Sequence, residues 1–365
     1  MEKKFTVPSS YEGQRLDKFL LSHFPQYSRA YLKKQIKQGN FLVNDKKVKP
    51  FYEMREGDTV AFAPGFSLPD AAKILPNPDI KLNIIFEDDD VIVINKPAGL
   101  SVHPRQDKNG LPLLSEIDST LVSGLLAYYP AIANVEDTSD HPNPPQPPLK
   151  GGSNASNSPP LGGVRGDFNF INIRPGIVHR LDKDTSGVMI IAKNQTAFDW
   201  LKKQFKKRQT NKTYLALVHG KLKNKEGEIK TLLARATSDP TKQKVIPLIN
   251  ADLKMPRIDA EIGTKGKEAI TQYKVIKEFK NYSLLEVHPK TGRLHQIRAH
   301  LAHLGHPVVD DKKYGNKRLP ILPGLTRQFL HAKELKITLA DGQKKVFSAP
   351  LPADLNGILQ TLENI

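Results

Sequence analysis

The sequence predicts an α+β protein in which a small α+β module precedes a larger domain with a mixed or antiparallel sheet. Segments with strand patterns outnumber segments with helical patterns, and the two kinds do not alternate as they would in a doubly wound sheet. The chain has 365 residues, which exceeds one typical domain. We therefore predict a module over residues 13–63, a Pro-containing linker over 64–80 and a larger domain over 81–352.

Composition restricts the class of partner and the compartment. The formal net charge of +17 favours a polyanionic partner, with nucleic acid first and an anionic membrane surface second. The absence of cysteine excludes disulfides and thiolate-bound zinc, and it fits a reducing compartment. No apolar run approaches the roughly 18 residues that cross a bilayer, and no signal-peptide core is present. We expect a cytoplasmic protein without a membrane partner.

The N-terminal segment predicts two helices followed by a β-hairpin, with a basic surface. Apolar residues recur at helical spacing over residues 16–24, and the stretch FLVNDKKVKP is typical of two strands joined by an Asn-Asp turn. The cations of the second helix and the hairpin are Arg29, Lys33, Lys34, Lys37, Lys46, Lys47 and Lys49. Between residues 29 and 49 only Asp45 opposes them. A solvated helix face is one interpretation, but the compact clustering favours a module that binds the RNA backbone.

The larger domain contains several apolar strand patterns and two amphipathic helices. The strands are predicted within DDVIVINKP, VMIIA, TYLALVHG, AITQYKVIKEF and YSLLEVHP. The helices are predicted around residues 198–205 and in LHQIRAHLAHLG, where Leu294, Ile297, Leu301 and Leu304 form an apolar stripe. Residues 136–168 are rich in Pro, Gly and Ser and hold too little apolar surface to offset chain entropy. We predict that they form a disordered insertion within this domain.

The stretch HRLDKDTSG concentrates polar chemistry directly before an apolar strand. In an extended segment Asp182 and Asp184 point to opposite sides, so they are poor candidates for the paired carboxylates of a glycosidase. One aspartate is expected to act while the other holds the loop through Thr185 and Ser186. A carboxylate beside an arginine stays ionised, which suits a nucleophile better than a general acid.

Arg298 lies on the apolar side of its predicted helix. An inward-facing arginine keeps its charge and requires a carboxylate or phosphate partner. Asp182 and Asp184 are the natural partners. A purely structural buried ion pair is an equally consistent interpretation of these residues alone.

The sequence carries no strong signal for a cofactor or a metal ion. Neither G-x-x-x-x-G-K-[ST] nor G-x-G-x-x-G occurs. The most metal-like set is His295, His300, His303 and His306, but no carboxylate or cysteine lies beside these residues to complete a site, although Asp310 and Asp311 follow. Helix-end and polar-contact roles are favoured for the histidines, and we predict no metal and no cofactor.

Three separated motifs resemble the RluA family of pseudouridine synthases. They are HRLDKDTSG, KTYLALVHG and TGRLHQIRAHLAHLGHPVVDDKKYG, and NKPAGLSVHP corresponds to the opening motif of the family. The resemblance covers residues 82–352 apart from the insertion and implies a pseudouridine synthase catalytic domain. The basic N-terminal module is similar to a small RNA-binding domain shared with a ribosomal small-subunit protein. The combination is most similar to the RluD-type subgroup, which acts on large-subunit ribosomal RNA.

The resemblance implies specific roles for residues of this sequence. Asp182 matches the catalytic aspartate, Tyr214 the tyrosine that stacks on the target base, and Arg298 the basic residue that pairs with the aspartate. Arg180 matches the arginine that holds the flipped nucleotide or its phosphate, and Leu330 the apolar residue under the base. Members often carry Gly-Asp where this chain has Val309-Asp310-Asp311, so either Asp310 or Asp311 takes the structural place of that aspartate.

We therefore expect an RNA-modifying isomerase that converts specific uridines, with large-subunit ribosomal RNA as the first expectation, to pseudouridine. Such an enzyme would consume no nucleotide, and a monomer would suffice for the chemistry. Two alternatives stay open at this point. The chain could be a non-catalytic factor in ribosomal RNA binding or assembly, or it could perform the same chemistry on transfer RNA.

Overall fold

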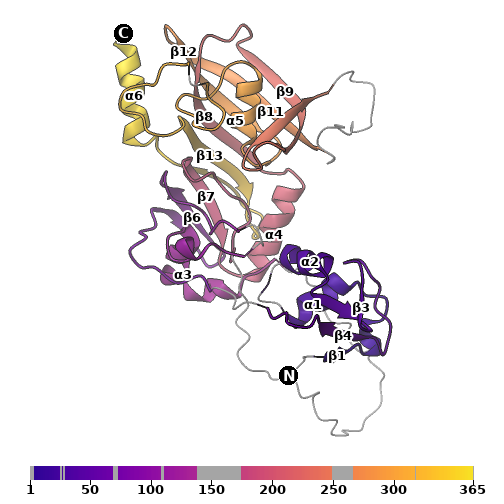
Figure 1. Cartoon of the computed structure of the whole chain (residues 1–365). Helices are drawn as coiled ribbons and strands as arrows, with labels where there is room; N and C mark the ends of the chain where they lie inside the picture. Colours follow the sequence, from indigo (N-terminus) through magenta and orange to yellow (C-terminus); the bar gives the residue numbers. More distant parts are fainter. Residues whose placement is uncertain are drawn as a thin grey trace. The chain divides into compact units, whose positions relative to one another are not determined.

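A computed structural model describes residues 4–24, 27, 29–68, 73–107, 111–137, 174–248, 266–316 and 318–364 (Figure 1). The predicted insertion at 136–168 therefore lies outside the described residues except for its first two. The chain divides into two compact units, one formed by Met1–Pro78 with His103–Pro175 and the other by Asp79–Val102 with Gly176–Ile365. Within the described part of the chain, no helix has the length and apolar character needed to cross a membrane.

Unit 1 begins with a small helix-and-sheet module. The module contains the helices α1 (Leu16–His23) and α2 (Arg29–Gln38) and the strands β1 (Lys4–Thr6), β2 (Phe41–Val43), β3 (Lys46–Lys47) and β4 (Thr59–Phe62). The second part of unit 1 contains helix α3 (Leu121–Tyr128). The strands pair antiparallel in the order β1-β4-β2-β3. The β2–β3 hairpin turns at Asn44 and Asp45, whose positive φ angles of 49° and 60° suit a two-residue hairpin turn. Phe19, Leu32 and Phe41 lie in the shared core of α1, α2 and β2.

The basic surface of this module is organised around one buried carboxylate. Asp17 on α1 is fully buried and accepts hydrogen bonds from Arg15 and Arg29 at 3.1 Å. Lys33 Nζ lies 3.3 Å from the same carboxylate. A buried carboxylate requires cationic partners, so Asp17 fixes α2 against α1 and orders two of the basic side chains of α2.

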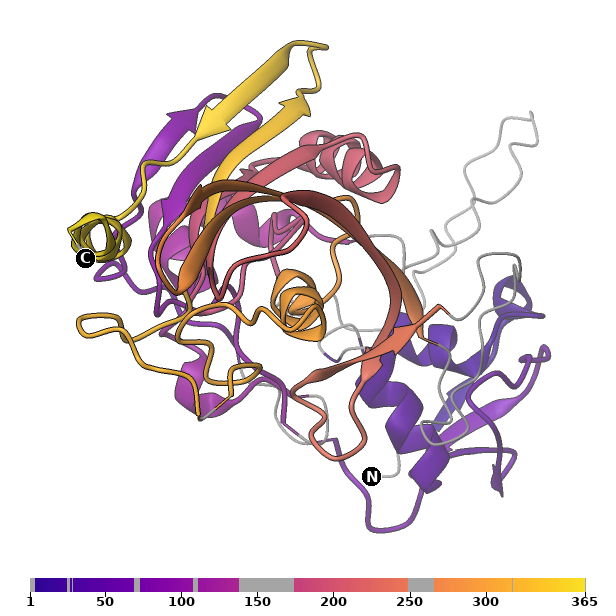
Figure 2. The same cartoon turned by 90° about the horizontal axis from the view of Figure 1, so that it is seen from above.

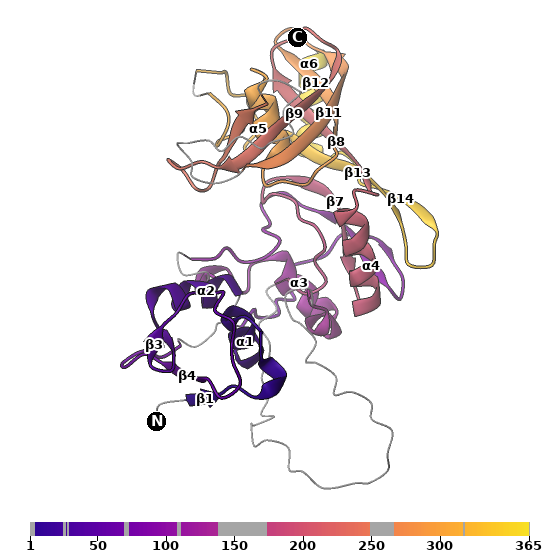
Figure 3. The same cartoon turned by 90° about the vertical axis from the view of Figure 1, so that its right-hand side faces the viewer.

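In the residues that the structure describes, unit 2 consists of one large curved sheet and three α-helices. Its strands are β5 (Ile84–Glu87), β6 (Val91–Lys96), β7 (Ser186–Ala192), β8 (Asn211–His219), β9 (Glu226–Arg235), β10 (Gln243–Pro247), β11 (Lys267–Glu278), β12 (Tyr282–Pro289), β13 (Leu330–Thr338) and β14 (Lys344–Ser348). Its helices are α4 (Gln195–Lys206), α5 (Gln296–His303) and α6 (Ala353–Glu363). Figure 3 shows α4 beside β7, which it contacts.

The strand order within the described residues is β10-β9-β11-β12-β8-β13-β7-β6-β5, with β14 paired to β13. The β13–β7 pair is parallel, and the other pairs are antiparallel. The predicted α+β class with a mixed sheet is confirmed. The parallel pair joins two segments that are far apart in sequence, because β7 directly follows the HRLDKDTSG motif and β13 lies near the C-terminus.

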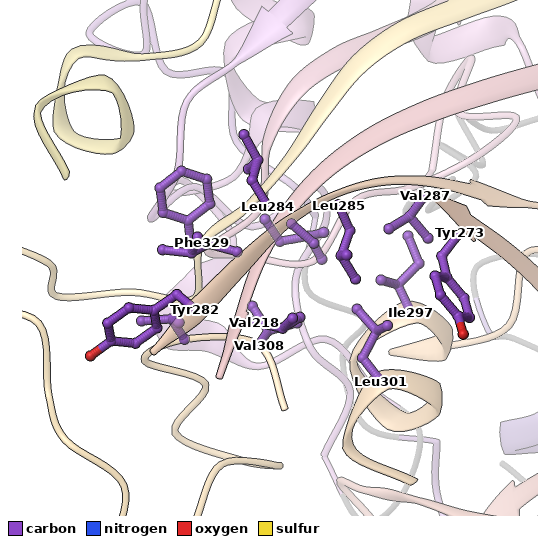
Figure 4. Packing of buried hydrophobic residues seen from close by; sticks show 14 of the residues in the cluster. Val218, Tyr273, Tyr282, Leu284, Leu285, Val287, Ile297, Leu301, Val308 and Phe329 are labelled. Atoms are coloured by element: carbon purple, nitrogen blue, oxygen red, sulfur yellow. The ribbon is translucent and has the colours of Figure 1, made fainter. Parts of the chain in front are cut away.

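Helix α5 packs inside the curve of this sheet (Figure 2). Ile297 and Leu301 point from α5 toward Leu285, Val287 and Tyr273 on the strands (Figure 4). Burial of a leucine or isoleucine side chain contributes about 1.5–3 kcal/mol, so these contacts fix the position of the helix. Any polar side chain on the same helix is thereby held at a defined place over the sheet.

The helix predicted at LHQIRAHLAHLG is shorter than expected. It begins at Gln296, because His295 adopts a left-handed conformation with φ of 52° that cannot continue a helix. The predicted apolar stripe is also wrong at its end, since Leu304 is 39% exposed and lies after the helix. The reason is that Gly305 follows, with φ of 87°, and turns the chain away from the core.

Candidate active site

The motif HRLDKDTSG forms a tight loop that leads into β7. We call residues 180–185 the Asp182 loop. The carbonyl of Asp182 accepts a hydrogen bond from the Thr185 backbone N–H at 3.1 Å, which closes a turn at Lys183 and Asp184. Gly187 follows with φ of 119°, and a Cβ at this position would lie 2.1 Å from the Ala332 carbonyl oxygen. The terminal glycine of the motif therefore permits the close approach of β7 to β13.

The side chain of Asp182 meets Arg298 of α5. Arg298 Nη1 donates to Asp182 Oδ2 at 2.8 Å. The rest of the guanidinium binds Asp311, with Nε 2.6 Å from Oδ2 and Nη2 2.7 Å from Oδ1. Arg298 and Asp311 are buried, while the side chain of Asp182 is 17% exposed. The structure thus identifies Asp182 rather than Asp184 as a partner of Arg298, and it places Asp311 as the second partner.

Arg298 and Asp311 stay charged although they are buried, because each is hydrogen-bonded to a group of opposite charge. Burial opposes the charge on Arg298, but the hydrogen bonds and attraction of Asp311, and then of Asp182, raise its pKa above the ordinary value. Burial likewise opposes ionisation of Asp311, yet the hydrogen bonds from Arg298 lower its pKa. Asp311 Oδ1 also accepts the backbone N–H groups of Lys313 and Tyr314 at 2.9 and 3.0 Å. Asp310 Oδ2 instead accepts the Leu322 N–H at 3.4 Å, so Asp311 and not Asp310 is the aspartate that binds Arg298.

Tyr214 lies in the sheet beside this cluster. It pairs with Val287 on β12 and with Ala332 on β13, and Ala332 pairs in turn with Gly187 on β7. This row of residues brings the end of the HRLDKDTSG motif next to Tyr214. Burial raises the pKa of Tyr214, and the negative charge of Asp182 raises it further, so the phenol stays protonated at neutral pH. An aromatic side chain and a carboxylate thus lie in the same region.

His295 and Tyr314 border Asp182 on the α5 side. His295 Nε2 lies 3.9 Å from Asp182 Oδ1, and Nδ1 lies 3.1 Å from the Tyr314 hydroxyl. Burial lowers the pKa of His295 to about 4, so it is neutral at pH 7 and does not compete with Arg298 for the carboxylate. The guanidinium carbon of Arg298 lies 5.4 Å from the centre of the Tyr314 ring. An aromatic ring therefore covers the guanidinium.

A buried lysine that the sequence analysis did not single out donates a hydrogen bond to the backbone of the Asp182 loop. Lys96, at the end of β6, is fully buried, and its Nζ donates to the carbonyl oxygens of Pro97, Leu100 and Lys183 at 2.6, 2.8 and 3.0 Å. Burial lowers its pKa to about 7, against the attraction of Asp184 and Asp182. A lysine directly after the apolar run VIVIN was the available signal, because a strand buried on both faces leaves little room for a solvated cation.

Comparisons with known proteins support the same assignment. Residues 163–303 match the family model described as RNA pseudouridylate synthase, and residues 14–60 match the S4 domain. An uncharacterized RNA pseudouridine synthase of Aquifex aeolicus is 38% identical over 310 residues, which are 84% of this chain and 78% of that protein. The ribosomal large subunit pseudouridine synthase D of Xylella fastidiosa is 34% identical over 371 residues, covering 99% of this chain and 92% of the relative.

This chain belongs to the RNA pseudouridine synthase family. A solved structure of human RNA pseudouridylate synthase domain containing 4 agrees in fold, with a TM-score of 0.53 and 22% identity over 77% of this chain and 93% of that one. The prediction of an isomerase of the pseudouridine synthase type, preceded by an S4 domain, is confirmed.

The other predicted site residues of the synthase are spread over both units. Arg180 is exposed at the start of the Asp182 loop, and Leu330 is buried on β13, paired with Ala216 of β8. In the S4 domain Arg29 and Lys33 bind Asp17, while Lys37 is exposed. Their roles in RNA binding stay predictions.

The histidines of the predicted metal-like set take separate roles in the synthase. His300 is buried between the hydroxyl groups of Thr231 and Thr271, at 2.9 and 2.8 Å. His306 Nδ1 lies 2.8 Å from the carbonyl oxygen of His219. Over the residues that the structure describes, no cluster of three or more His, Cys, Asp or Glu side chains is arranged to hold a metal ion.

Proposed function

We propose that this synthase isomerises specific uridines of large-subunit ribosomal RNA, with Asp182 as the catalytic residue. The observation that carries the proposal is the single hydrogen bond from Arg298 to Asp182, in a cluster where Asp311 takes the other two arms of the guanidinium. Because Asp182 is partly exposed, its carboxylate remains accessible to a substrate while Arg298 holds its orientation. The relatives named ribosomal large subunit pseudouridine synthase D support the choice of RNA.

The reaction that this site would catalyse is balanced without any other reactant. The bond between the sugar C1′ and uracil N1 breaks, the base turns, and C1′ bonds to C5, which releases the C5 proton as N1 gains one. Asp182 would act as nucleophile or as proton acceptor during this exchange. No nucleotide is consumed, and one chain carries every proposed group, so we also propose that the protein works as a monomer without a cofactor. We further propose that it works in the cytoplasm.

The target base must leave the RNA stack to reach Asp182. We propose that Tyr214 stacks on the extruded base, since an aromatic face contributes about 1–3 kcal/mol to base binding. Leu330 would supply apolar contact beneath the base, and Arg180 would bind the nucleotide or its phosphate from the rim of the loop. These roles are consistent with the pKa of Tyr214, which keeps its hydroxyl neutral beside Asp182.

The S4 domain would bind the RNA backbone through α2. Arg29 and Lys33 are held by Asp17, which pre-orders them, while Lys34 and Lys37 lie on the same helix. Each lysine that contacts a phosphate should contribute about 1 to the slope of log affinity against log salt. Replacing Lys34 and Lys37 by glutamine should lower that slope, whereas replacing the exposed Lys274 and Lys280 of unit 2 should not. Equal slopes in both variants would contradict this role.

The test of the catalytic proposal is release of tritium from [5-³H]uracil-labelled RNA. Large-subunit, small-subunit and transfer RNA transcripts, free or in assembly intermediates, would be incubated with the protein without added nucleotide or metal. We expect release from large-subunit RNA by the wild type and no release by Asp182→Asn. The matched control is Asp184→Asn, which removes the same charge two residues away and should keep most of the activity.

Each outcome of this assay is informative. Release confined to transfer RNA would show that the substrate is transfer RNA and not large-subunit ribosomal RNA, with the same reaction. Absence of release from every RNA, with RNA binding retained, would favour the non-catalytic binding factor. Activity in Asp182→Asn but not in Asp184→Asn would overturn the assignment of the reacting carboxylate.

A further inference from the structure

Arg327 is a buried cation that the proposed chemistry does not use. It precedes β13 and is 8% exposed. Its guanidinium forms a two-armed pair with Asp354 in the first turn of α6, with Nε 2.7 Å from Oδ2 and Nη2 3.1 Å from Oδ1. Burial opposes the charge on Asp354, but the hydrogen bonds from Arg327 lower its pKa. The pair therefore anchors Arg327 to the C-terminal helix.

Arg327 also contacts the residues that follow Asp182, one through its backbone and one through its side chain. Nη1 lies 3.2 Å from the Asp184 carbonyl oxygen, and Nη2 lies 3.4 Å from Ser186 Oγ. Both contacts are long, so each is weak alone, but they come from one planar group whose position is set by Asp354. A rigid fork loses little entropy when it binds several acceptors, which makes arginine suited to this geometry and lysine unsuited.

Neighbours of Arg327 hold the same short stretch. Gln328 Nε2 donates to Thr185 Oγ1 at 3.3 Å, and His331 Nδ1 lies 2.9 Å from Ser186 Oγ. Residues 184–186 are thus each contacted by the segment 327–331. Arg298 orients the Asp182 side chain directly, whereas this segment holds the Asp184 carbonyl and the hydroxyl groups of Thr185 and Ser186.

We propose that Arg327 is a positioning residue for the isomerisation: anchored by Asp354 of α6, it holds residues 184–186 and thereby keeps Asp182 in register with Tyr214. The inference rests on the proposed function, because it matters only if Asp182 is the reacting group. Misplacement of a reacting group by about 1 Å can cost roughly 100-fold in rate. We therefore expect Arg327→Gln to lower kcat by about 10- to 100-fold while KM for RNA changes less than threefold.

Two further variants test the anchor. Asp354→Asn should lower kcat by a smaller factor, and the double variant Arg327→Gln/Asp354→Asn should be no slower than Arg327→Gln alone, because the two residues act as one unit. Arg327→Lys keeps the charge but cannot contact Asp354 and the Asp184 carbonyl in the same geometry, so it should recover activity only in part. All rates are measured at a temperature where thermal melts show each variant folded.

The matched control is the ion pair of Lys277 with Glu363, which also joins α6 to the sheet but does not contact the Asp182 loop. Lys277→Ala should leave kcat unchanged. An equal loss in Lys277→Ala, or a folded Arg327→Gln with kcat within twofold of wild type, would overturn the inference. An active Asp182→Asn variant would instead reject the proposed function itself, so the two failures are distinguishable.

Discussion

The two aspartates that bind Arg298 should differ in what their loss of charge affects. Removing the charge of Asp311 should lower the stability of the fold, whereas removing the charge of Asp182 should abolish activity. Asp311 is fully buried and accepts four hydrogen bonds, two from Arg298 and two from backbone N–H groups. Asparagine at position 311 would offer one acceptor oxygen and would turn an NH₂ group toward a donor. Removing one partner of a buried ion pair costs about 3–5 kcal/mol, so Asp311→Asn should lower the free energy of unfolding by that amount.

Asp182 should behave differently in the same measurement. It accepts one hydrogen bond from Arg298 and is partly exposed, so solvent can compensate for the change. A hydrogen bond to a charged group contributes about 1.5–3 kcal/mol, and partial exposure places Asp182→Asn at or below the lower end of that range. Asp182→Asn should therefore be folded and inactive, whereas Asp311→Asn should be clearly less stable and retain part of its activity.

Urea denaturation followed by tryptophan fluorescence measures the free energy of unfolding of unit 2, which contains both aspartates. The chain has a single tryptophan, Trp200 on α4, whose indole N–H donates to the Thr338 carbonyl of β13. Its fluorescence therefore reports on unit 2. Activity of the folded fraction is measured by tritium release. If Asp182→Asn proves less stable than Asp311→Asn, the division into a structural and a reacting carboxylate is wrong.

Three further predictions follow from individual contacts. Burial lowers the pKa of Lys96 to about 7, below the ordinary lysine value of about 10.4. Between these two pH values the unfolded chain binds more protons than the folded chain, so the free energy of unfolding should rise with pH. Lys96→Met should flatten that rise by up to about 1.4 kcal/mol per pH unit, and an unchanged slope in urea titrations at several pH values would contradict this. Tyr214→Phe should keep kcat within about threefold, while Tyr214→Leu should lose about 1–3 kcal/mol of base binding in tritium-release kinetics; equal losses would argue against stacking. Gly187→Ala would place Cβ 2.1 Å from the Ala332 carbonyl oxygen, so its melting temperature should fall sharply, and a wild-type melt would show that β7 and β13 can separate at no cost.

Much of the site was predictable because buried charge has strict requirements. An arginine on the apolar side of a helix demands an anionic partner, and that argument correctly narrowed the choice to the carboxylates of HRLDKDTSG. It did not find Asp311, because a second acidic partner 13 residues after Arg298 leaves no periodic signal. The residues alone left Asp182 and Asp184 open, and only the resemblance selected Asp182; among contacts, the hydrogen bond from Arg298 to Asp182 separates the two, and it joins segments 116 residues apart.

The basic surface of the S4 domain shows a different limit. Counting charges between residues 29 and 49 found only Asp45 opposing the cations, and that window was too narrow. Asp17, which lies 12 residues before Arg29, is the carboxylate that binds Arg29 and Lys33. Asp17 stands between Leu16 and Lys18 in an amphipathic helix, so the pattern alone places it on the solvent-facing side until the second helix is seen to cover it.

The distribution of charge around Arg298 leaves the proposed reacting carboxylate both fixed and accessible. A two-armed pair between Arg298 and Asp182 would occupy both carboxylate oxygens and leave little to meet a substrate. The geometry instead gives two arms to Asp311 and one to Oδ2 of Asp182, while His295 Nε2 lies 3.9 Å from Asp182 Oδ1. Since burial keeps His295 neutral, this neighbour does not add a positive charge beside that oxygen. Arg298 thus orients Asp182 while Asp311 balances most of the arginine charge, which is the arrangement a nucleophile or proton acceptor requires.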